Sequence, residues 1–276
     1  MICSGKELAV NDDHEGIMIL DTNEKLGTPI ENILKFNEDV LFELDLTPNR
    51  GDCLSHLGVA RELGIIEKKD VKRRLFKLTE ATDSTRDEIE VSIENSDACP
   101  RYAARVIKGV KVNPSPPWLA ERLTSIGFSS INNIVDAANY VLMDLGHPLH
   151  TFDLDKISGN EIKVRYAKDG EQFTTLDDEK RKLKDFHLLI CDGENPVALA
   201  GIMGGVNSEI TDDTTDILLE SAYFNPAVIR KGAKVLDIST EASRRFERDT
   251  DIEGVIPAVD QLAALIQEVA GGKILK

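Results

Sequence analysis

Hydrophobic and polar residues alternate along much of the chain with the two-residue period of strands. Residues 89–93 alternate strictly, and residues 105–112 follow the same pattern with Gly109 as a candidate bulge. Turn-like pairs such as Asp177-Asp178 and Gly204-Gly205 separate the apolar pieces that come later in the chain. These pieces predict further strands at residues 162–166, 188–190, 197–202 and 217–219.

A second set of apolar residues recurs at helical spacing. It predicts helices at residues 53–63, 117–126, 134–145 and 258–270, each followed by a glycine. Asp52 is the expected N-cap of the first helix, and Thr240 is the expected N-cap of a further helix that begins at Glu241. Because strands and helices do not alternate regularly, the pattern predicts an α+β fold with a strand-rich, β-sandwich-like core and flanking helices.

The order of these elements predicts three segments. Residues 1–38 mix turn signals with short apolar pieces and do not resemble a complete domain. A strand-like piece from Val40 and the helix after Asp52 form a small helical module, which the polar stretch 79–88 is expected to link to the rest. The predicted segments are therefore 1–38, 39–84 and 85–276.

Composition narrows the class of protein. The 276 residues are 41% hydrophobic and 30% charged, which is ordinary globular usage and excludes a disordered, collagen-like or coiled-coil chain. The longest apolar runs fall far short of the ~20 residues that span a bilayer. The first residues lack the layout of a secretory signal, and the four cysteines form no C-x-x-C pair. We expect a cytoplasmic protein with reduced, mostly buried thiols and no membrane segment.

The charge balance bears on nucleic-acid binding. The chain has 33 Lys and Arg against 49 Asp and Glu, a formal net charge of −16, which as an average argues against a nucleic-acid binder and predicts no DNA partner. Residues 230–248 depart from that average, with six basic and three acidic residues. This segment is a candidate phosphate-contacting face despite the global sign.

Residues 147–155 contain two histidines and two aspartates, and three interpretations stay open. Pro148 separates His147 from His150, so the two cannot share a helical face as in the H-E-x-x-H motif. The histidines and Asp153 could still bind a metal, or they could satisfy backbone groups in a helix-to-strand connection. Alternatively, His150 is a catalytic or substrate-orienting group, because histidine titrates near neutrality.

Two further clusters each have a structural and a functional interpretation. The small residues around Gly201 and Gly204 either form a tight turn or bring backbone N–H groups close to a ligand oxygen. Glu220 follows two apolar strand residues and faces either solvent or a pocket. In a pocket its carboxylate would accept a hydrogen bond from a ligand hydroxyl or ammonium group.

Taken in order, several motifs resemble those of the β subunit of bacterial phenylalanine–tRNA ligases. They are LTPNRGDCL at 46–54, VDAANYVL at 135–142, GHPLHTFD at 146–153, GIMGG at 201–205, LLESA at 218–222 and TEASRRFER at 240–248. The ordered set is far more specific than any one motif, and it spans nearly the whole chain. The resemblance implies an internal fragment, with the end of a tRNA-binding OB domain at 1–38 and the central editing domain from about 85 to 250.

That family's central domain hydrolyses tyrosine mischarged onto phenylalanine tRNA. The resemblance implies that Glu220 accepts a hydrogen bond from the tyrosine hydroxyl, while His150 and Asn139 line the pocket near the amino-acid and ribose groups. It implies pocket walls and floor at Gly201, Gly204, Thr240 and Ala242. Arg244, Arg245 and Arg248, which lie in the basic segment 230–248, are the candidates for RNA contact.

The same resemblance implies the partners: phenylalanine tRNA, and the synthetase α subunit through the parent β subunit. The parent enzyme is expected to use ATP and magnesium, whereas this fragment is expected to hold no cofactor or metal. This chain has Ala138 where many family members carry Thr, and it has Ser129 where some carry Arg. We therefore assign these two positions no role. Two alternatives remain: a non-catalytic tRNA-binding or assembly scaffold, and a metal-dependent hydrolase that uses His147, His150 and Asp153.

Overall fold

The computed structural model describes residues 3–8, 10, 13–34, 40–73 and 76–276. The chain forms two compact units, Met1–Glu43 and Leu44–Lys276. The described part of the first unit contains one helical turn, α1 (Ile30–Ile33), and mostly exposed side chains. All of the candidate site residues lie in the second unit.

The units divide earlier in the chain than the linker predicted from sequence. Residues 79–88 attach to the second unit, because the Ala81 N–H donates to the Ile274 carbonyl at 2.7 Å and the Thr85 N–H donates to the Lys276 carbonyl at 2.8 Å. The strand predicted from Val40 is not present either, since residues 40–46 have no regular secondary structure. Residues 79–88 therefore form a polar surface segment of the second unit and, contrary to the prediction from the sequence, do not link two separate units.

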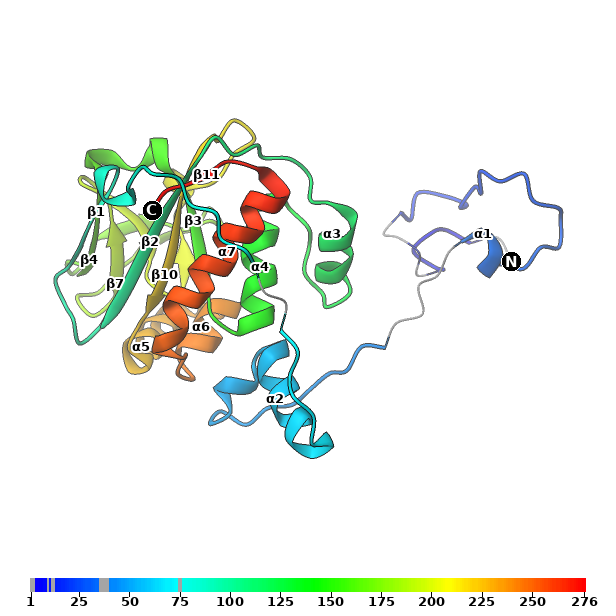
Figure 1. The fold of residues 1–276 in the computed structure, drawn as a ribbon, viewed down its shortest axis with the longest axis horizontal. Coiled ribbons are helices and arrows are strands. Elements are labelled where there is room, and N and C mark those ends of the chain that lie inside the picture. Colours follow the sequence, from blue (N-terminus) through cyan, green and yellow to red (C-terminus); the bar gives the residue numbers. More distant parts are fainter. Residues whose placement is uncertain (1–2, 9, 11–12, 35–39, 74–75) are drawn as a thin grey trace. The chain divides into compact units, whose positions relative to one another are not determined.

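Two sheets make the core of the second unit (Figure 1). The first has the strand order β11-β2-β10-β3, and the second has the order β1-β4-β7-β8-β9. The strands of the first sheet are β2 (Arg101–Lys108), β3 (Leu149–Asp153), β10 (Asp216–Tyr223) and β11 (Lys273–Ile274). Those of the second are β1 (Glu90–Ile93), β4 (Glu161–Tyr166), β7 (Leu188–Cys191), β8 (Pro196–Leu199) and β9 (Met203–Gly204). A separate hairpin pairs β5 (Gln172–Thr174) with β6 (Lys180–Lys182).

The central strand β10 is covered on both faces, which explains its nearly continuous apolar sequence. Ile217 and Leu219 face the helices, whereas Leu218 and Ala222 face the second sheet. Side chains alternate along a strand, so Glu220 shares its face with Leu218 and Ala222 and is directed into the space between the sheets. This face decides where the site can form.

Helices cover the other face of the first sheet. They are α4 (Asn133–Leu145) and α7 (Val255–Ala270), which pack against each other (Figure 1). Helix α7 packs on β2 and β10, and α4 packs on β3. The remaining helices are α2 (His56–Glu67), α3 (Pro117–Thr124), α5 (Pro226–Leu236) and α6 (Glu241–Phe246). The observed α+β architecture confirms the predicted fold class. Among the described residues, no helix has the length and apolar character that crossing a membrane requires.

The predicted helix boundaries hold best where local capping is strong. Gly146 ends α4 at φ 76°, as the sequence predicts, and the Asn132 side chain caps the start of this helix. The predicted cap of α2 is wrong, because Asp52 lies in a 3₁₀ turn and Ser55 accepts the capping hydrogen bond from Gly58. The sequence analysis also missed α5, although Asn225 followed by Pro226 is a helix-start signal.

Candidate functional site

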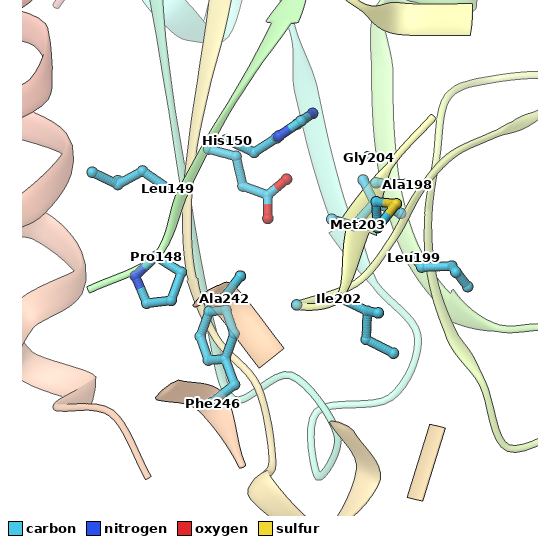
Figure 2. A pocket seen from close by; sticks show the side chains of 13 residues that line it. Pro148, Leu149, His150, Ala198, Leu199, Ile202, Met203, Gly204, Ala242 and Phe246 are labelled. Carbon is cyan, nitrogen blue, oxygen red and sulfur yellow. The ribbon is translucent and has the colours of Figure 1, made fainter. Parts of the chain in front are cut away.

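A small pocket with a cavity volume of about 80 Å³ opens between the two sheets. Figure 2 shows His150 and Leu149 on one side, Met203, Gly204 and Ala198 on another, and Ala242 with Phe246 along a third. The lining residues are Pro148, Leu149, His150, Ile190, Ala198, Leu199, Gly201, Ile202, Met203, Gly204, Glu220, Ala242 and Phe246. The pocket is thus apolar except for an imidazole and a carboxyl group.

Glu220 provides the carboxyl group of the pocket. The residue is only 6% exposed, and its Oε2 atom is buried without a hydrogen-bond partner. Burial raises the pKa of Glu220 to about 8, with the Tyr102 hydroxyl acting in the opposite direction. The solvent-facing interpretation of Glu220 is therefore wrong. An unpartnered buried oxygen at a pocket wall is a ready acceptor for a ligand that brings its own donor.

His150 lies directly across from Glu220 in the pairing of β3 with β10. Burial lowers the pKa of His150 to about 4, so the imidazole is neutral at neutral pH. Its ring packs edge-on against Phe152, with the ring centroids 4.6 Å apart. A neutral imidazole offers one donor and one acceptor, which suits orientation of a substrate or a water molecule.

Two glycines give the pocket wall its shape. A Cβ atom on Gly204 would lie 2.6 Å from His150 Cε1, so any side chain there would displace the imidazole. Gly201 has φ +66°, and a Cβ atom on it would lie 2.9 Å from Phe224 Cδ2. Position 204 therefore needs glycine because a side chain has no space there. Position 201 needs glycine both for space and for its left-handed backbone conformation.

Thr240 and Ala242 belong to the start of α6 but have different positions. The Thr240 hydroxyl accepts the capping hydrogen bond from the Ser243 N–H at 3.0 Å and donates to the Ile202 carbonyl at 2.8 Å. It joins the helix to the pocket wall without lining the pocket itself. Ala242 does line the pocket, and its small side chain leaves room there.

Asn139 is not brought into this group of residues. It lies on α4, the helix that packs on the opposite face of the first sheet, and it is absent from the residues that line the pocket. The predicted pocket therefore unites His150, Glu220, Gly201, Gly204 and Ala242 and leaves Asn139 outside.

The three candidate RNA-binding arginines differ in exposure. The side chain of Arg245 is 4% exposed and donates to the Leu54 carbonyl at 3.1 Å and to Glu241 at 2.6 Å. Its burial does not fit an RNA contact and assigns it to holding the segment before α2 against α6. Arg244 pairs with Glu241 and Arg248 pairs with Glu247, with 51% and 23% of their side chains exposed. RNA contact by these two residues stays a prediction.

The alternative of a metal site at residues 147–155 does not fit the structure. His150 faces the space between the sheets. Asp153 comes three residues later on β3, and because side chains alternate along a strand it faces the opposite way. Asp153 accepts a hydrogen bond from Thr214 Oγ1 at 2.7 Å, and His147 packs against the Phe246 ring at 6.4 Å between centroids. The three side chains therefore do not converge on one point.

A different donor group, Asp52, Cys53 and Glu62, does converge among the described residues. Arg50 already satisfies it, because Arg50 Nη2 lies 2.9 Å from Asp52, 2.9 Å from Cys53 Sγ and 2.8 Å from Glu62. All four cysteines are free thiols, and Cys53, Cys99 and Cys191 are buried, as the sequence predicts.

The sequence analysis missed Tyr102, whose hydroxyl is buried beside Glu220. The predicted strand began at residue 105, but β2 begins at Arg101. The signal was present in the alternation of Tyr102, Ala104 and Val106, which places all three on the face that carries Glu220.

Comparison with known proteins agrees with the sequence resemblance. A family model described as "B3/4 domain" matches residues 98–271. The chain is 52% identical over its whole length to the phenylalanine–tRNA ligase β subunit of Syntrophotalea carbinolica, and 50% identical over 99% of its length to that of Geobacter metallireducens. It is also 46% identical over 99% of its length to the β subunit of Protochlamydia amoebophila. In each case the chain covers 34% of the relative, so it spans about a third of the length of these proteins.

Proposed function

The chain belongs to the B3/4 domain family, and on that premise we propose that its pocket is a hydrolytic editing site. In this proposal the chain is part of a phenylalanine–tRNA ligase β subunit, as its relatives are named. It releases tyrosine that has been attached wrongly to phenylalanine tRNA. Its partners are that tRNA and, through the β subunit, the synthetase α subunit.

Elementary recognition chemistry explains the need for such a site. A hydrophobic pocket built for phenylalanine rejects an isostere with one added hydroxyl only by a factor of about 10². A second pocket that requires the hydroxyl reverses the selection, because tyrosine can donate a hydrogen bond that phenylalanine cannot. The second pocket must therefore present a buried acceptor in apolar surroundings.

Glu220 is the observation that carries the proposal. Its Oε2 atom has no partner in the structure, and the surrounding wall is apolar. A tyrosine hydroxyl would supply the missing donor. Because burial raises the pKa of Glu220 to about 8, the carboxyl is mostly protonated at neutral pH, and a hydrogen bond between neutral groups contributes about 0.5–1.5 kcal/mol. Phenylalanine would leave the oxygen buried and unpaired, so the site discriminates by attraction to tyrosine and by a penalty for phenylalanine.

The hydrolytic step uses water as the nucleophile, because no serine or cysteine lines the pocket. The water oxygen attacks the ester carbonyl carbon, and the bond from that carbon to the tRNA ribose oxygen breaks. The water's OH group becomes part of the tyrosine carboxyl group, and its other proton goes to the ribose oxygen. The products are tyrosine and the tRNA with its terminal hydroxyl restored. We assign His150 the role of orienting the substrate or the water, and we assign stabilisation of the developing oxyanion to backbone N–H groups near Gly201.

The test measures release of tyrosine from Tyr-tRNA(Phe) by the purified chain, with Phe-tRNA(Phe) as the competing substrate. Glu220→Ala should lower the preference for tyrosine by about five- to a hundredfold, because it removes the penalty of about 1–3 kcal/mol that phenylalanine pays for leaving a buried acceptor unpaired. His150→Ala should slow release from both substrates. Glu90→Ala removes an exposed carboxylate from β1 and should leave rate and preference unchanged.

The outcomes separate the proposed function from its alternatives. Release that is no faster than spontaneous hydrolysis would overturn the proposal and favour a tRNA-binding or assembly scaffold. Release abolished by a chelator and restored by a divalent metal would favour metal-dependent hydrolysis. If Glu220→Ala kept the full preference for tyrosine, the specificity assignment would be wrong even if hydrolysis occurred.

A further inference from the structure

A second polar group lies beside Glu220 and has no part in the site described so far. The Tyr102 hydroxyl is buried and, like Glu220 Oε2, has no hydrogen-bond partner. Tyr102 is absent from the residues that line the pocket, whereas Glu220 is present among them. Two buried, unpartnered polar atoms that occur together need a common explanation, because each one by itself is costly.

The strand pairing places the two side chains on one face. In the β2–β10 register Glu220 is opposite Ala104, and Tyr102 is opposite Ala222. Tyr102 and Glu220 are therefore diagonal neighbours, a separation that long and aromatic side chains can cross. Their direct partners are both alanines, which leave the space through which the phenol ring leans toward the carboxyl group. Tyr102 thus adjoins Glu220 while the pocket remains open to a ligand.

Besides Tyr102, the titratable groups that face Glu220 come from β3 and from the residues before β2. From β3, His150 is the cross-strand partner, and its imidazole is neutral at neutral pH. Cys99, before β2, is a thiol whose pKa is raised to about 12 by burial and, to a smaller extent, by the nearby Glu220. The pocket-lining residues from the second sheet and from α6 are apolar or glycine.

We propose that Tyr102 is a positioning residue that donates its hydroxyl hydrogen to one oxygen of Glu220 and leaves the other oxygen for the substrate. This inference rests on the proposed function, since it assigns the second oxygen to the tyrosine hydroxyl of the substrate. The enzyme's own phenol then fixes the direction of the carboxyl group before the substrate's phenol arrives. Such preorganisation lowers the cost of ordering the acceptor on binding.

The bond also favours the charged form of the carboxyl group. A donor that bonds a carboxylate stabilises its ionised state and lowers its pKa. Tyr102→Phe removes the hydroxyl and keeps the ring that fills the space, so the Glu220 carboxyl should need a higher pH to ionise. We expect an upward shift of about one pH unit, the size of effect expected for loss of one hydrogen bond to a carboxylate.

Two measurements test the proposal in the full chain. The first follows the Glu220 carboxyl carbon by ¹³C NMR across pH in the wild type and in Tyr102→Phe, with the resonance assigned through Glu220→Gln. The second measures the preference for Tyr-tRNA(Phe) over Phe-tRNA(Phe) as a function of pH. Tyr223→Phe is the matched control, because it removes a tyrosine hydroxyl from β10 that bonds Asp249 at 2.8 Å and not Glu220.

In Tyr102→Phe, the pH midpoint of the Glu220 NMR titration and the pH midpoint of the substrate preference should move upward together. In Tyr223→Phe, both midpoints should coincide with those of the wild type. An unchanged NMR midpoint in Tyr102→Phe would overturn the inference, because a structural role alone does not move the ionisation of Glu220. An upward NMR shift with no deacylation by the wild type would support the Tyr102–Glu220 bond and refute the editing function. The two proposals therefore fail on different readouts.

Discussion

Replacing Glu220 with glutamine removes a buried ionisable group and keeps its size and shape. Burial raises the pKa of Glu220 from 4.5 to about 8, so the folded chain keeps a proton that the unfolded chain releases. The stability that this proton supplies is fully present below about pH 4.5 and is lost as the pH rises to about 8. Glutamine has no proton to lose, so the Glu220→Gln variant should gain stability relative to the wild type across this range.

The size of the gain follows from the two pKa values. A shift from 4.5 to about 8 corresponds to about 5 kcal/mol, at about 1.36 kcal/mol for each unit. Proton linkage predicts that the wild type has lost about 3 kcal/mol of this stabilisation at pH 7 and nearly all of it at pH 9. Since domains are stable by only about 5–15 kcal/mol, an effect of this size is readily measured.

Urea denaturation at pH 4.5, 7 and 9 measures this difference. Trp118 is the only tryptophan in the sequence and packs edge-on against Tyr140, with the ring centroids 5.8 Å apart. Its fluorescence reports unfolding of the unit that contains the pocket. Glu90→Gln removes an exposed carboxylate and should show a stability difference from the wild type that does not change with pH.

A stability difference between Glu220→Gln and the wild type that is the same at all three pH values would contradict this prediction. That result would mean that the Glu220 carboxyl is equally solvated in the folded and unfolded chains. A difference of the opposite sign, with the wild type favoured at high pH, would mean that the folded state stabilises the ionised form.

Substitutions at three buried positions, with one exposed control, test the packing of the second unit. Gly204→Ala should cost about 1–3 kcal/mol in urea denaturation and should abolish tyrosine release, because the new methyl group would occupy the space of the His150 ring. Arg245→Met should destabilise the chain by about 1–3 kcal/mol, since it removes the donor to the Leu54 carbonyl and leaves Glu241 with only its pair to Arg244. Arg244→Ala on the exposed side should cost less than about 1 kcal/mol. Asp136→Asn should cost about 1–3 kcal/mol in the same assay, because the buried carboxylate accepts bonds from two serine hydroxyls and a backbone N–H; equal midpoints would contradict this role.

The local parts of the fold could be predicted because short-range rules govern them. Helix α4 lies where the sequence predicts it, since Asn132 and Gly146 satisfy its ends within one turn. The same rules failed at Asp52, where a 3₁₀ turn moves the cap to Ser55. The strand predicted from Val40 failed for another reason, since a strand needs a pairing partner that no local pattern supplies.

The sequence by itself determined the α+β class, the order of most elements and, through its ordered motifs, the family resemblance. It could not decide whether Glu220 faces solvent or a pocket, because a strand buried on both faces lacks the polar alternation that would reveal the answer. Only the tertiary structure pairs Glu220 with His150 across β3 and β10 and brings Tyr102 beside it from β2. It also places Asn139 on α4, outside the residues that line the pocket, and buries Arg245. The reason is physical: the burial that shifts the pKa of Glu220 and leaves its oxygen unpartnered comes from contacts between segments far apart in the chain.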